Sequence, residues 1–181
     1  MRISEDRYTR EQHSLQLALR FLMHEARTQT IRAWTGLSGD RIRKLYHSYT
    51  ARAGHYIRRR RGKSPYRIDC FAKSVRVQQE TVWLASLLSL FGVIPPEPCA
   101  EESSALPSVA RGELLCEAFE TYRAMIPSSQ ISFEHAVFLA TTLSRGDLLR
   151  LGGCVECGGL MVTERFPIRE KRCHHCAAAR I

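Results

Sequence analysis

Four cysteines near residue 165 place the strongest constraint on how this chain folds. They form two Cys-x-x-Cys pairs separated by 15 residues, Cys154 with Cys157 and Cys173 with Cys176. Because this spacing is typical of four thiolates that close on one tetrahedral zinc ion, we expect one structural zinc per chain at these four residues. A redox dithiol would instead need a single pair at the start of a helix in a strand-helix-strand unit.

Basic residues surround the second cysteine pair, namely Arg169, Lys171 and Arg172. Positive charge favours thiolate over thiol and offsets part of the negative charge of a four-thiolate zinc site. Two histidines, His174 and His175, lie between Cys173 and Cys176. We expect both to point outward, because the four cysteines already fill the zinc coordination.

Positive charge is concentrated in the first half of the chain. Residues 1–91 hold 18 Lys or Arg and 7 Asp or Glu, whereas residues 92–181 hold 9 and 11, and the whole chain has a net charge of +9. From Arg41 to Lys63 there are nine basic residues and no acidic one. A polyanion such as nucleic acid is the partner that this pattern favours, over a solvated charge run or an anionic membrane surface.

Residues 28–47 have the layout of a helix-turn-helix. Ile31 and Trp34 face inward from a first helix, Gly36 suits a left-handed turn, and Ile42 with Leu45 packs a second helix back on the first. The outer side of the second helix then offers the side chains of Arg41, Arg43, Lys44 and His47 to a DNA major groove. A two-helix hairpin with a solvated basic face is the alternative interpretation.

A basic arm follows at residues 52–63. We expect it to contact phosphates through Arg52, Arg58, Arg59, Arg60, Arg61 and Lys63.

Apolar periodicity predicts further helices, and a weak alternation predicts a short strand at residues 160–166. The predicted helices cover residues 11–26, 69–91, 113–126 and 132–145. The expected fold is mainly α: a helical domain at residues 1–151, with a linker at 95–108, and a small zinc-binding module at 152–181. Ser132 is the expected N-cap of the last helix.

The remaining cysteines, Cys70, Cys99 and Cys116, are an odd number, which suits a reducing compartment better than a disulfide framework. Charged residues interrupt any apolar run near the start, and the longest mainly apolar run, 81–94, is too short to span a bilayer. We expect a cytoplasmic protein without membrane contact. No carboxylate cluster or activated nucleophile indicates an enzyme.

A helix-turn-helix layout, then a helical middle, then two C-terminal Cys-x-x-Cys pairs is an order of features that resembles the FlhC family. Members of this family are subunits of a flagellar master transcriptional activator. The most similar stretches are Leu37–Ser38 with Arg41–Tyr46, the segment Glu117–Tyr122, and Cys157–Gly159. The resemblance implies a zinc-binding, DNA-binding subunit that joins an FlhD-like partner in a heterohexamer. Such a complex binds promoters of flagellar and related operons and assists RNA polymerase. A zinc-ribbon protein that binds RNA or acts in translation is the alternative.

Overall fold

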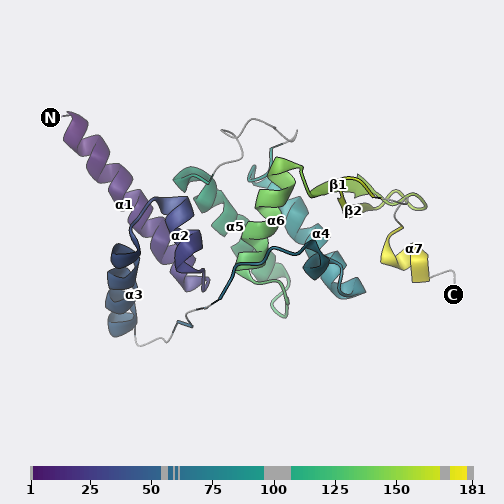
Figure 1. Cartoon of the computed structure of the whole chain (residues 1–181), viewed down its shortest axis with the longest axis horizontal. Coiled ribbons are helices and arrows are strands. Elements are labelled where there is room, and N and C mark those ends of the chain that lie inside the picture. Colours follow the sequence, from purple (N-terminus) through teal and green to yellow (C-terminus); the bar gives the residue numbers. More distant parts are fainter. Residues whose placement is uncertain are drawn as a thin grey trace. The chain divides into compact units, whose positions relative to one another are not determined.

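The computed structural model describes residues 2–53, 57–58, 60, 62–95, 107–167 and 172–178. These residues contain seven α-helices, one short 3-10 helix and a two-stranded sheet (Figure 1). The chain divides into two compact units, one of Met1–Ser64 with Pro107–Cys116 and one of Pro65–Leu106 with Glu117–Ile181. The predicted fold class, mainly helical with a four-cysteine cluster at its C-terminal end, is confirmed. The greater part of the predicted linker, residues 96–106, lies outside the described residues.

The first unit is built from α1 (Arg2–Met23), α2 (Thr28–Thr35), α3 (Gly39–Ala53) and the start of α5 (Val109–Met125). Phe21 and Trp34 meet in its core with ring centroids 6.0 Å apart, and Leu17, Ile31 and Ile42 are buried with them. The predicted start of α1 at residue 11 is wrong. The helix extends back to Arg2, and residues 7–10 are exposed, because this stretch contains neither proline nor glycine and helix propensity alone permits the extension.

Gly112 allows α5 to approach α1 and α2 closely. A Cβ at this position would lie 2.5 Å from Leu17 Cδ2 and 3.3 Å from Trp34 Cε3. One residue later, Glu113 accepts a hydrogen bond from Arg20, with 2.6 Å between Oε2 and Nη1. The start of α5 is therefore an integral part of the first unit.

The second unit contains a 3-10 turn, η1 (Ile68–Phe71), followed by α4 (Val75–Leu90), the rest of α5 and α6 (Phe133–Arg145). Its core includes Leu84, Leu88, Tyr122, Phe133 and Leu139, all at most 2% exposed. Ser132 occupies the predicted N-cap position of α6, but its Oγ lies 2.7 Å from His135 Nδ1 and caps no backbone N–H, and Gly146 ends this helix in a left-handed conformation at φ 61°.

The predicted start of α4 at residue 69 is wrong. Ser74 is the N-cap, in an extended conformation, and its Oγ accepts the backbone N–H of Val77 at 3.2 Å. Residues 68–71 form η1 instead, so that Phe71 is buried from a separate turn. The serine cap offers the first helical N–H groups a partner, which fixes the start of the helix.

A β-hairpin follows α6. Strand β1 (Leu149–Gly153) pairs antiparallel with β2 (Leu160–Glu164), so that Leu149 lies opposite Glu164 and Gly153 opposite Leu160. The sequence predicted β2 but not β1, because Gly152 and Gly153 indicated a break. The domain boundary predicted between residues 151 and 152 falls within β1. A short helix, α7 (His174–Ala178), ends the described chain. In the described part, none of the helices has the length and hydropathy needed to cross a membrane.

Candidate metal centre and basic helix

The first cysteine pair lies in the tight turn of the hairpin. β1 leads directly to Cys154, whose N–H donates to the carbonyl of Gly159 and whose carbonyl accepts the N–H of Gly158, both at 2.9 Å. Gly158 has φ +70°, a left-handed conformation that side chains with a Cβ disfavour. The turn brings the Cys154 and Cys157 side chains to the same side of the hairpin end.

The second cysteine pair is joined to the first by one backbone donor and one ion pair, and a further backbone donor lies within the second pair. The N–H of Cys173 donates to Sγ of Cys154 at 3.2 Å, and the N–H of Cys176 donates to Sγ of Cys173 at 3.4 Å. Arg172 Nε lies 2.9 Å from Glu156 Oε1, which joins the segment before the second pair to the first pair.

The four sulfur atoms lie within 4.8 Å of one another, with 3.7 Å between Sγ of Cys157 and Sγ of Cys173. A tetrahedral ion with metal–sulfur bonds of about 2.3 Å would hold its sulfurs about 3.8 Å apart, whereas a disulfide bond would need about 2.05 Å. Cys154 is buried and Cys157 is exposed. The four cysteines can therefore hold one metal ion.

Electrostatics within the cluster also fits a cation. Backbone N–H groups of Cys157, Cys173 and Glu156 lower the pKa of the Cys154 thiol to about 6. The neighbouring sulfurs of Cys173 and Cys157 instead raise the pKa of Cys176. Four thiolates in so small a volume repel one another unless a cation lies between them, and a coordinating metal deprotonates its thiols outright.

Of the groups predicted to surround this cluster, His175 and Arg172 are exposed. The side chain of His174 and residues Arg169 and Lys171 lie outside the described part of the chain.

Helices α2 and α3 are consecutive, contact each other and are joined by a tight turn, at the positions where the sequence predicted two helices and a turn. Gly36 ends α2 with φ 71°, and its N–H donates to the carbonyl of Arg32 at 2.9 Å. Thr35 Oγ1 accepts the N–H of Leu37 at 3.2 Å, and Leu37 is buried at the corner between the helices. Ser38 precedes α3, and its Oγ accepts the N–H of Arg41 at 3.3 Å.

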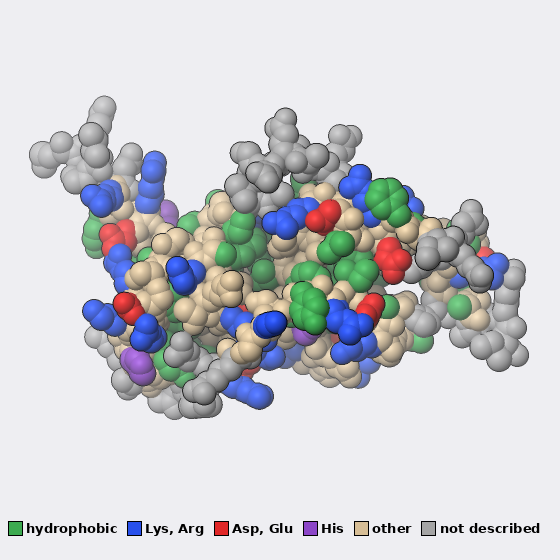
Figure 2. Space-filling view, in the orientation of Figure 1, with side chains coloured by type: hydrophobic (Ala, Val, Ile, Leu, Met, Phe, Trp, Pro, Cys, Tyr) green, Lys and Arg blue, Asp and Glu red, His purple; other side chains and the backbone are tan. Residues whose placement is uncertain are grey.

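The basic side chains predicted to contact DNA from α3 are all exposed, but two of them have acidic partners. Arg41 pairs with Glu11 of α1, and Arg43 Nη2 lies 2.5 Å from Asp40 Oδ1. The exposed face also includes Lys44 and His47. On the face drawn in Figure 2, blue Lys and Arg side chains lie over the region of α1 and α3 with a few acidic ones between them.

The predicted basic arm is described only in part. Arg58 and Lys63 are exposed, and Arg60 Nη2 pairs with Glu25 Oε2 at 2.9 Å. Arg59, Arg61 and the side chain of Arg52 lie outside the described residues. Each described cation of the arm therefore faces solvent at least in part.

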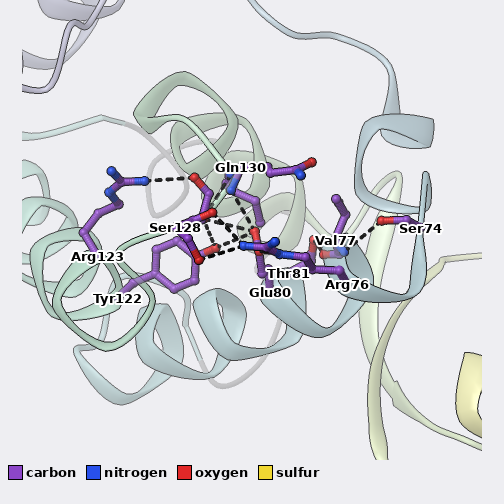
Figure 3. Close-up of polar contacts among 11 residues, drawn as sticks. Ser74, Arg76, Val77, Glu80, Thr81, Tyr122, Arg123, Ser128 and Gln130 are labelled. Carbon is purple, nitrogen blue, oxygen red and sulfur yellow. Dashed lines mark hydrogen bonds and ion pairs between the residues drawn. The ribbon is translucent and has the colours of Figure 1, made fainter.

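Sequence analysis missed a buried polar cluster around Glu80, which is 3% exposed (Figure 3). Its carboxylate accepts hydrogen bonds from Arg76 Nε at 2.8 Å, the N–H of Gln130 at 3.0 Å, Ser129 Oγ at 3.1 Å and the Tyr122 hydroxyl at 3.3 Å. The cluster ties α4 to the loop between α5 and α6. In sequence, the only indication was an arginine four residues before the glutamate.

A scan against protein-family models found no match for the chain, and a search of curated proteins found none either.

Proposed function

We propose that this chain is a DNA-binding transcriptional activator subunit, with α3 as the helix that contacts the major groove and a structural zinc ion at the four cysteines. The observation that carries the proposal is the arrangement of α2 and α3. Their inner sides are buried at Ile31, Trp34 and Ile42, while the outer side of α3 is exposed and basic. A helix held in this way can enter a major groove about 12 Å wide.

The outer face of α3 supplies groups suited to phosphates and base edges. Arg43, Lys44 and His47 follow one another at helical spacing and are exposed. The ion pair between Arg43 and Asp40 is also exposed, with side chains 59% and 78% accessible. Exposed pairs of this kind contribute about 1 kcal/mol or less, so that a DNA phosphate can replace the aspartate.

The basic arm supports the same proposal. Arg58 and Lys63 are exposed, and between them in sequence Arg60 forms an ion pair with Glu25 of the first unit. Arginines at this density follow a phosphate backbone and add affinity without adding sequence specificity.

Zinc is the proposed metal because the ligand set consists of four sulfurs at tetrahedral spacing. Thiolates select soft or borderline ions, and zinc accepts four of them in a closed structural site. The metal would contribute its binding energy to folding of the hairpin end and α7, and no catalytic activity is proposed for it or for the chain.

The resemblance to the FlhC family supports the remaining parts of the proposal. An FlhD-like subunit is the proposed partner in a heterohexamer, RNA polymerase is the proposed target of activation, and promoters of flagellar and related operons are the proposed DNA. The cytoplasm is the proposed compartment, since promoters are reached there.

The test is duplex binding by the chain together with an FlhD-like partner. Fluorescence anisotropy with labelled promoter fragments of flagellar operons measures the affinity of the wild type and of a Lys44→Ser/His47→Ser variant. Each good base contact contributes about 1–3 kcal/mol, so the double variant should bind at least about tenfold more weakly.

Lys73→Ser is the matched control, because Lys73 is exposed in the second unit and away from α3 in sequence. It should bind DNA as the wild type does. An equal loss of DNA affinity in both variants would mean that α3 contributes only general positive charge and no specific contact. Preferential binding of structured RNA over duplex DNA in a competition titration would replace the proposal by the RNA-binding alternative.

A further inference from the structure

A pocket of about 340 Å³ lies between one face of α4 and strand β2 in the second unit. α4 contributes Val75, Gln78, Gln79, Val82 and Trp83, whose spacing places them on a single helix face, and also Thr81. This volume falls within the range of about 300–1,000 Å³ that is usual for small-molecule sites. Neither the metal centre nor α3 accounts for this pocket.

The opposite wall is also apolar. β2 provides residues 160–162, and buried Phe71 of η1 closes one side. Trp83 and Leu160 are 54% and 47% exposed, which is high for large apolar side chains. Apolar surface left open in this way favours an occupant that removes it from water.

Polar side chains in the pocket are few: Gln78, Gln79 and Thr81, with Cys173 and His175 at its border. Among the described lining residues there is no lysine, arginine, aspartate or glutamate. The side-chain amides of Gln78 and Gln79 have no hydrogen-bond partner within the described chain. Each amide offers both donors and an acceptor, so that together they can orient a neutral polar group.

We infer that this pocket binds a small, uncharged, largely apolar molecule that carries an aromatic ring and one hydrogen-bonding group. The ring would pack against Trp83 and Val82, and the polar group would bond to the glutamine amides. An ionised ligand is disfavoured because no lysine, arginine, aspartate or glutamate of the described lining compensates the loss of its hydration. Cys173 and His175 border the same pocket, so the ligand would also contact the segment that carries the second cysteine pair.

The test is titration of the full chain with N-phenyl-1-naphthylamine, a neutral aromatic probe whose direct-excited fluorescence rises in apolar surroundings. We expect saturable binding to one site. Three competitors of similar shape then separate the charge classes: 2-naphthalenemethanol, 2-naphthoate and 2-naphthylmethylammonium. The neutral alcohol should displace the probe at concentrations at least tenfold lower than either ion.

Two substitutions locate the binding site. Val82→Phe fills the pocket from α4, and Leu160→Trp fills it from β2 at a position that is about half exposed, where added bulk removes no core contact. Each should weaken probe binding at least tenfold. Leu90→Phe is the matched control, because Leu90 is 79% exposed on the same helix and does not line the pocket.

The inference is overturned if neither the probe nor the neutral alcohol binds saturably. In that case a side chain of a partner protein would be the remaining candidate occupant of the pocket. It is also overturned if an ion competes as well as the alcohol, or if both filling variants bind like the wild type while their melting temperatures are unchanged. DNA binding does not enter the readout, so failure of either proposal leaves the other testable.

Discussion

Replacing Glu80 by glutamine should destabilise the second unit strongly, although the two side chains have nearly the same shape. The carboxylate is 3% exposed and accepts four hydrogen bonds, one of them from the guanidinium of Arg76. A glutamine has one acceptor oxygen, so its NH₂ group would face either Arg76 Nε, which now bonds to Oε1, or the donors that now bond to Oε2, among them the Gln130 N–H. In either orientation at least one donor would lose its partner.

The expected cost follows from these contacts. Hydrogen bonds to a charged group contribute about 1.5–3 kcal/mol, and an unsatisfied buried donor costs about 1–3 kcal/mol. Arg76 limits the loss, because it is half exposed and keeps its bonds to Ser128. We therefore expect the free energy of unfolding to fall by about 3 kcal/mol at pH 7, which lowers a urea midpoint by about 1–3 M for slopes of about 1–3 kcal/mol per M.

The pH dependence gives a second readout. Burial by itself raises the pKa of Glu80, but the hydrogen bonds from Arg76, Gln130 and Ser129 outweigh it, so that the pKa is lowered overall. A carboxylate with a lowered pKa stabilises the fold fully above its unfolded pKa of about 4.3, and this stabilisation is lost as the pH falls through the folded value. The gap between wild type and variant should be constant from pH 8 to about 5.5 and narrow below pH 4.

Urea titrations of both proteins at each pH measure this gap, and release of any metal held by the four cysteines in acid would affect both proteins alike. Glu117→Gln is the control, because Glu117 is exposed on α5 and should change stability by less than about 0.5 kcal/mol. A Glu80→Gln variant as stable as this control at pH 7, or a gap that widens in acid, would refute the role assigned to the cluster.

Three other substitutions test separate features. Gly112→Ala should cost about 1–3 kcal/mol in urea unfolding through overpacking, whereas Gly39→Ala, where a Cβ meets nothing within 4 Å, should cost almost nothing. Cys157→Ser should reduce zinc from one equivalent per chain to below half in native mass spectrometry, while Cys70→Ser keeps it; equal zinc in both would exclude the four-cysteine site. Changing all four arginines at 58–61 to serine should reduce the slope of log affinity for DNA against log salt by about 3, and an unchanged slope would remove the arm from the interface.

The cysteine cluster and the helix-turn-helix could be predicted because their determinants are local. Two Cys-x-x-Cys pairs define a ligand set by spacing alone, and Gly36 followed by buried Leu37 marks a tight turn within a few residues. The fold class follows from the same local patterns. Contacts between distant segments played little part in these predictions.

The features that sequence analysis missed depend on distant partners. Glu80 follows two glutamines and resembles a surface residue, and it is buried by Tyr122 of α5 and the loop at residues 128–130, which are distant in sequence. β1 contains two glycines, and its strand conformation comes from pairing with β2. Charge counts located the cations of α3 but not the pairing of Arg41 with Glu11, because that glutamate lies thirty residues earlier on another helix.

The proposed function requires contact between α3 and DNA, and site-specific photo-crosslinking detects this contact. A photoreactive phenylalanine replaces His47 on the exposed face of α3 or, as the control, exposed Lys73 in the second unit. In the complex with an FlhD-like partner and a promoter duplex, position 47 should crosslink to DNA and position 73 should not. A complex that binds the duplex but crosslinks only from position 73, or from neither position, would contradict the claim.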